Sequence, residues 1–95
     1  MSDRLKKIFS EKEPKTKLIS YFVGCYPDYD QSLSLMKEAI DNGVSILEIG
    51  YVTSEASAEG PIIKKAHDHV LSNGGNLNDI INLVKDLRSY SDKIG

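Results

Sequence analysis

The stretch Ile46-Leu47-Glu48-Ile49-Gly50 is a short apolar run with one carboxylate near its middle, and its composition predicts a β-strand. A carboxylate in such a strand is costly to bury unless it is hydrogen-bonded or has a chemical role. Residues 51–59 show no regular periodicity and carry Glu55 and Glu59, before Gly60-Pro61 opens an amphipathic segment. We therefore expect a strand, a loop and a helix, with the loop at the strand's carboxyl end, where α/β folds place their chemistry.

The rest of the chain also alternates between two kinds of segment. One kind is a continuous apolar run as long as a strand, and the other has apolar residues at helical spacing. Strand, helix and strand within about thirty residues make a βαβ unit, whose strands are parallel and whose crossover is right-handed. Lys93-Ile94-Gly95 looks like the opening of one more strand. From the amino end we expect a helix over 2–11, a strand over 17–23 buried on both faces, a helix from Tyr29 or Asp30 to Asn42, a strand over 45–51, a helix over 62–71 and a last helix after Asn76.

Each of the three longer helices is expected to bury one apolar stripe. The residues expected to face inward are Leu33, Met36, Ala39 and Ile40 in the first, Ile62, Ile63, Ala66, Val70 and Leu71 in the second, and Leu77, Ile80, Ile81, Val84 and Leu87 in the last.

Length and composition indicate one small soluble domain, spanning residues 1–95. The net charge is −2 without a basic stripe, so we expect no nucleic-acid partner, and no apolar stretch is long enough for a membrane span or a signal peptide. The single cysteine, Cys25, excludes an internal disulfide and fits a reducing cytoplasm. His67 and His69 are two residues apart on a helix and cannot easily share a metal, so we expect surface histidines, no metal site and no cofactor.

Several segments together resemble the alpha subunit of tryptophan synthase. They are Tyr21–Asp28, Leu47–Gly50, Ser54 and Ala58–Ile63, and they follow one another in a single register over almost the whole chain. The resemblance implies an eight-stranded (β/α) TIM barrel that cleaves indole-3-glycerol phosphate to indole and glyceraldehyde 3-phosphate in a retro-aldol reaction. Such a barrel needs about 250 residues. The fold class expected here is therefore α/β: a truncated barrel fragment holding the first two βα units.

The same resemblance assigns roles to three residues. Glu48 matches the glutamate that acts as a general acid toward the indole ring, and Glu59 matches the aspartate that handles the proton on the indole nitrogen. Tyr21 matches the phenylalanine that lines the indole pocket. The prolines and phenylalanine of the family's second loop are absent from Val52–Ala56, and the phosphate-binding loops belong to the far half of the barrel.

Each of these residues also has a structural interpretation. Glu48 can be a strand carboxylate satisfied by backbone or water, and Tyr21 can be core packing. Glu59 can be an acid favoured by the dipole at the start of a helix.

Two parallel strands alone make a poor sheet, and helices can cover only one of its faces. We therefore expect self-association through strand edges. The expected function is that of a truncated tryptophan synthase alpha-like protein with little or no activity alone. The alternative is a non-catalytic binding or regulatory module, which docks on a tryptophan synthase beta subunit or acts as a homo-oligomer.

Overall fold

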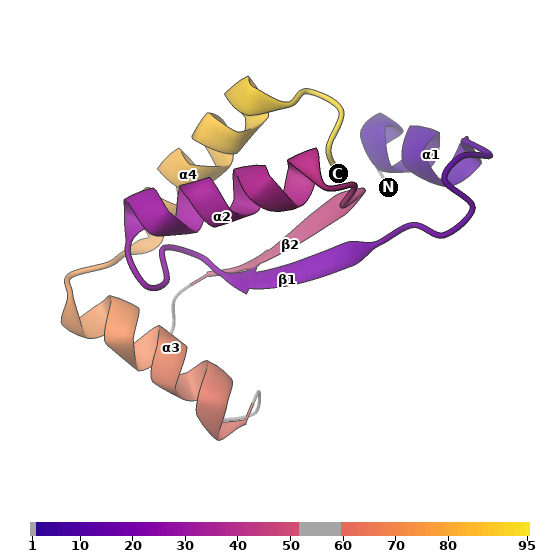
Figure 1. The fold of residues 1–95 in the computed structure, drawn as a ribbon. Coiled ribbons are helices and arrows are strands. Elements are labelled where there is room, and N and C mark those ends of the chain that lie inside the picture. Colours follow the sequence, from indigo (N-terminus) through magenta and orange to yellow (C-terminus); the bar gives the residue numbers. More distant parts are fainter. Residues whose placement is uncertain (1, 52–59) are drawn as a thin grey trace.

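The computed structural model describes residues 2–51 and 60–95 (Figure 1). Two strands form a parallel sheet, and the helices α2 and α4 lie over one side of it. Helix α1 lies at the end where the strands begin, and α3 lies at the opposite end. The elements are α1 (Asp3–Ser10), β1 (Ile19–Val23), α2 (Tyr29–Asp41), β2 (Ile46–Gly50), α3 (Pro61–Ser72) and α4 (Leu77–Tyr90). The expected order of elements and fold class are thereby confirmed.

Local chemistry explains where the helices begin. The Ser2 hydroxyl accepts the Leu5 N–H at the start of α1, and the Asp28 carboxylate accepts the Gln31 N–H at the start of α2. Helix α4 begins with a capping box formed between the side chains and backbones of Asn76 and Asp79. Helix α3 has no side-chain cap, but it begins with a proline, whose missing N–H costs nothing there.

The sheet has one covered face and one open face. Register partners in a parallel pair lie side by side on the same face, so Ile19 lies beside Ile46 and Tyr21 beside Glu48. The Ile19 and Tyr21 side chains are 50% and 37% exposed. The expectation that this strand is buried on both faces is wrong, because the helices cover only the face that carries Phe22 and its neighbours. The expectation that helices cover one face only is confirmed.

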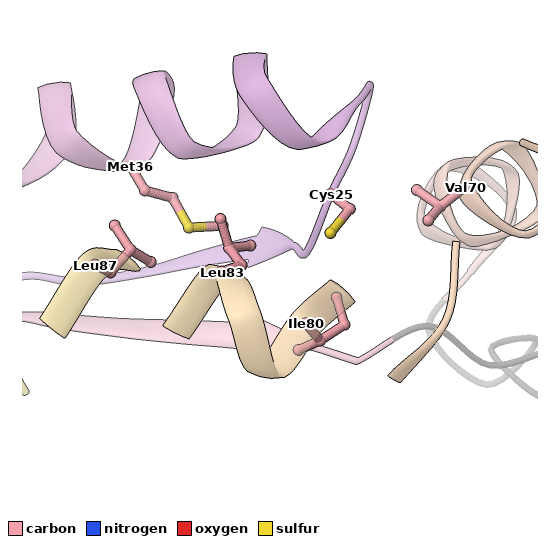
Figure 2. Close-up of a cluster of buried hydrophobic side chains, with 6 residues drawn as sticks. All are labelled: Cys25, Met36, Val70, Ile80, Leu83 and Leu87. Atoms are coloured by element: carbon pink, nitrogen blue, oxygen red, sulfur yellow. The ribbon is translucent and has the colours of Figure 1, made fainter. Parts of the chain in front are cut away.

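The core lies between α2, α4 and the covered face of the sheet. Met36 of α2 and Leu83 of α4 are completely buried and point toward each other in Figure 2. Cys25 extends this core beyond the end of β1, toward α3. The buried cluster is Cys25, Met36, Val70, Ile80, Leu83 and Leu87.

On α4 the buried stripe is narrower than expected. Leu77, Ile81 and Val84 are between 43% and 59% exposed, although the pattern predicted them to face inward. The helix instead packs through Leu83 together with Ile80 and Leu87, which lie three or four residues apart on one line of the helix. The remaining apolar residues of α4 lie beside this line and stay in contact with solvent.

Helix α3 differs more strongly from expectation. Ile62 is 80% exposed and Leu71 is 37% exposed, whereas His67 and Val70 are almost completely buried. The expectation that His67 is a surface group is therefore wrong. The helix touches the rest of the chain along one short line, and His67 and Val70 share that line because they are three residues apart.

The carboxyl-terminal residues begin a second parallel pairing, on the side of β2 opposite β1. The Gly95 N–H donates to the Ser45 C=O and the Leu47 N–H donates to the Gly95 C=O, each at 3.0 Å. These two bonds are the pattern of a parallel rung opposite Ile46. The Arg88 guanidinium donates to the Ile94 C=O at 2.6 Å and holds the segment in place. The expected strand opening at residues 93–95 is confirmed in its first rung.

Candidate functional site

The candidate site lies on the open face of the sheet, where Glu48 and Tyr21 are register partners on β2 and β1. The Glu48 side chain is exposed, because α2 and α4 lie on the other face. Its carboxylate is therefore a solvated acid beside an aromatic ring. Such a pair can exchange a proton with a planar ligand and pack against its face.

Gly50 makes room for the Tyr21 side chain. A β-carbon at Gly50 would lie 2.1 Å from the Tyr21 hydroxyl oxygen and 2.8 Å from the adjacent ring carbon, so the ring leans along the sheet and covers this glycine. Sequence reasoning did not assign Gly50 this role. The alternation of faces along a strand could have indicated it. Residues 48 and 50 lie on the same face of β2, and Tyr21 of β1 pairs with Glu48.

The second expected catalytic residue, Glu59, lies outside the described residues, as does Glu55. The structure therefore neither joins Glu59 to Glu48 nor separates the two. What it fixes are the two ends of the connection, Tyr51 after β2 and Gly60 before α3. Gly60 has a φ of 94°, a left-handed conformation that favours glycine.

The turn after β1 holds a buried thiol. Cys25 has a φ of 67° and is 6% exposed, and its N–H donates to the Ser32 hydroxyl at 3.0 Å. Burial, with a smaller effect from the Asp79 carboxylate, raises the pKa of the Cys25 thiol. A cavity of about 320 Å³ lies beside it, between the starts of α2 and α4 and the end of α3. A neutral buried thiol is a packing group.

Helix α3 is fastened to this turn by His69. Its Nε2 atom lies 3.1 Å from the Pro27 C=O and 3.0 Å from the Asn73 amide nitrogen. The Tyr26 ring meets the His69 ring edge-on, with centroids 5.4 Å apart. Although exposed as expected, His69 has a structural contact that its sequence position did not predict.

Across residues 2–51 and 60–95, no three histidine, cysteine or acidic side chains come close enough to hold a metal ion. In the same residues, no helix has both the length and the apolar character required to cross a bilayer. On the described open face, Glu48 and Tyr21 are side chains that can take part in proton exchange and ring packing. These features define a class: two βα units of a parallel α/β barrel, with an acid on the strand face that the helices leave open.

Comparison with known proteins identifies the family. The family model for the tryptophan synthase alpha chain matches residues 8–94, so this chain belongs to that family. The tryptophan synthase alpha chain of Aquifex aeolicus is 44% identical over 87 residues, which are 90% of this chain and 33% of the relative. That of Neisseria meningitidis serogroup B is 34% identical over 85 residues, with the same coverage.

Solved structures agree with this assignment. A structure from Aquifex aeolicus VF5 has a TM-score of 0.90 at 39% identity and covers 98% of this chain and 38% of that one. Tryptophan synthase subunit alpha from Legionella pneumophila has a TM-score of 0.87 at 26% identity, covering 99% of this chain and 37% of the other. The chain spans about a third of the length of the curated relatives it matches. Its fold is that of the first two βα units of the family barrel.

Proposed function

We propose that this chain carries the Glu48 part of an indole-3-glycerol-phosphate lyase site of tryptophan biosynthesis, in the cytoplasm, and that it turns over little substrate alone. The observation that supports this most directly is the pairing of Glu48 with Tyr21 on the open face, in a chain that belongs to the alpha-chain family. Exposure of this face supports low activity, since water competes with the substrate for the Glu48 carboxyl group when the site is not closed.

In this proposal, Glu48 donates a proton to the indole ring carbon that bears the glycerol phosphate chain. Glu59 takes the proton from the indole nitrogen. The bond between that ring carbon and the side chain then breaks, its electron pair moves into the ring, and Glu59 returns the proton to the indole nitrogen. The neighbouring hydroxyl gives its proton to the Glu48 carboxylate as it becomes the aldehyde of glyceraldehyde 3-phosphate. Tyr21 packs against the ring and orients it.

A coupled assay for indole release tests the proposal. Turnover above the buffer rate should be small, and Glu48→Gln should abolish it because the amide cannot donate a carboxylic proton. Glu13→Gln is the matched control, since Glu13 is an exposed glutamate in the linker before β1. Turnover that survives Glu48→Gln, or that falls equally in the control, would contradict the assignment of Glu48.

Membership of the alpha-chain family also supports a second function, that of a non-catalytic module that docks on a tryptophan synthase beta subunit. A pull-down with a beta subunit of the same source tests this function. A complex that forms equally well with Glu48→Gln supports docking without chemistry, and the absence of a complex contradicts docking.

A further inference from the structure

The face of the sheet that α2 and α4 leave open carries three register pairs (Figure 1). From the amino ends of the strands to their carboxyl ends, the pairs are Ile19 with Ile46, Tyr21 with Glu48, and Val23 with Gly50. The two outer pairs have no polar side-chain atoms. The Tyr21 hydroxyl and the Glu48 carboxylate are therefore the polar side-chain groups of these three pairs, and a ligand on this face meets apolar surface around both of them.

The Tyr21 side chain crosses from its own pair to the next one. A β-carbon at Gly50 would lie 2.1 Å from the Tyr21 hydroxyl oxygen, 2.8 Å from Cζ and 3.2 Å from Cε2. Because these distances shorten toward the hydroxyl, the ring directs its hydroxyl at Gly50. The tyrosine thus places a polar atom at the carboxyl end of β2, two residues beyond its register partner Glu48.

Exposure along β1 falls in the same direction. Ile19 is 50% exposed, Tyr21 is 37% exposed and Val23 is 8% exposed. Val23 is the register partner of Gly50, so the hydroxyl reaches the most sheltered end of this face. A hydrogen bond in a sheltered position competes with less water and contributes more than one in open solvent. The carboxyl ends of parallel barrel strands are also where ligands bind.

The separation of the two polar groups suits a flat ligand of two fused rings. Glu48 and Gly50 lie about 6.6 Å apart along β2, because each residue of a strand advances by about 3.3 Å. The Tyr21 ring lies between the Glu48 position and its own hydroxyl, and it offers an aromatic face for stacking. A bicyclic ring stacked there has the Glu48 carboxylate beside it and the Tyr21 hydroxyl near one end.

We propose that the Tyr21 hydroxyl determines the specificity of this ring site and selects a bicyclic ring with a hydroxyl substituent over the unsubstituted ring. A phenolic hydroxyl donates one hydrogen bond and accepts others, and a hydroxyl on the ligand does the same. The two can therefore pair whichever contacts Tyr21 makes within the chain. All parts of this arrangement lie within the register of β1 and β2, and no strand edge takes part in it.

The selectivity is a property of the tyrosine, since the phenylalanine that the resemblance gives at this position has no hydroxyl. The inference rests on the ring site of the proposed function, and it does not require turnover. Its readout is accordingly the ratio of two binding affinities, which is measured separately from indole release.

An NMR titration of the chain with indole, and with hydroxyindoles substituted on the six-membered ring, measures this ratio. At least one hydroxyindole should bind about two- to tenfold more tightly than indole, which is the effect of one neutral hydrogen bond. Tyr21→Phe should remove the preference, because it keeps the ring and loses the hydroxyl. Tyr90→Phe is the matched control and should keep it. Tyr90 is 44% exposed, and its hydroxyl donates to Asp41 of α2 on the covered side of the sheet.

Gly50→Ala tests the position of the hydroxyl. The new methyl group would overlap the hydroxyl oxygen, so Tyr21 has to move although its hydroxyl is retained. The preference for the hydroxyindole should therefore fall in this variant as well. Circular dichroism checks that the helices are intact in each variant. A Gly50→Ala chain with the wild-type ratio would overturn the placement of the hydroxyl over Gly50.

The remaining outcomes separate this inference from the lyase assignment. Equal affinity of the wild-type chain for indole and every hydroxyindole would overturn the inference and leave the ring site in place, as would a preference that persists in Tyr21→Phe. Failure to bind any of these rings would overturn both the inference and the ring site. A chain that shows the preference but releases no indole supports the inference and contradicts the lyase activity alone.

Discussion

The replacement Leu83→Ala tests whether the core lies where the structure places it. Leu83 is fully buried on α4 and faces Met36 of α2 (Figure 2). Removal of three buried carbons leaves a cavity that rigid neighbours cannot fill, and such changes cost about 2 to 5 kcal/mol. We expect about 3 kcal/mol here, because the site is enclosed by two helices and the sheet. A domain of this length has a total stability of roughly 5 to 14 kcal/mol.

Urea denaturation followed by circular dichroism measures the effect. With a slope of about 1.5 kcal/mol per molar urea, a loss of about 3 kcal/mol lowers the midpoint by about 2 M. The control is Leu77→Ala, because Leu77 is on the same helix but 59% exposed, and its cost should stay below about 1 kcal/mol. Both proteins are compared at one chain concentration, since association would shift the apparent stability. Equal midpoints for the two variants would refute the assignment of the core to the Leu83 side of α4.

Three further outcomes are expected. Gly50→Ala should cost about 1 to 3 kcal/mol and change the tyrosine ring resonances in an NMR spectrum, since its new methyl group would overlap the Tyr21 hydroxyl. A disulfide reagent should label Cys25 slowly in the folded chain and quickly in urea, because burial raises the pKa of the thiol and blocks access to it. Burial and the hydrogen bond to Asp86 raise the pKa of Tyr29 to about 12. The stability that Tyr29 contributes is therefore present below about pH 10 and is lost as the pH rises toward 12. Tyr29→Phe should flatten this alkaline decline in thermal melts.

Much of the fold followed from local sequence signals. The Asp28 and Asn76 caps and the Asn42-Gly43 stop mark helix ends through hydrogen bonds made within a few residues, so the sequence alone contains them. The two strands were predictable because their apolar runs are too short for helices and lie a helix apart. The rung at Gly95 was also foreseen, since a βαβα order leads to another strand.

Burial on α3 and α4 was not predictable from periodicity. An apolar pattern gives the direction of a helix face but not the width of the contact, which depends on how closely the neighbouring element approaches. On α4 that contact is a single line through Leu83, so Ile81 and Val84 remain exposed. On α3 the same limit made His67 look like a surface residue, although its distance from Val70 places it on the buried line.

For the candidate site, the sequence identified Glu48 and Tyr21 through the family resemblance, and the register shows why the two belong together. The number of residues between Tyr21 and Glu48 does not show that they are neighbours, because the pairing of two parallel strands depends on the tertiary fold. Gly50 was quoted only as part of a motif, and its use as space for the Tyr21 ring needed coordinates. The role of Glu59 stays a prediction, since that residue lies outside the described part of the chain.

The open face separates two requirements that the family reaction combines. The indole ring packs best against a dry surface, whereas Glu48 and Tyr21 lie on a face that the helices leave open. The phosphate group needs loops that the resemblance assigns to the far half of the barrel. We therefore expect the chain to bind indole weakly, through the Tyr21 ring. Isothermal titration with indole checks this: binding that disappears in Tyr21→Ala and persists in Tyr90→Ala, a similarly exposed tyrosine on α4, places the ring at Tyr21. Equal binding by both variants would contradict a ring site on the open face.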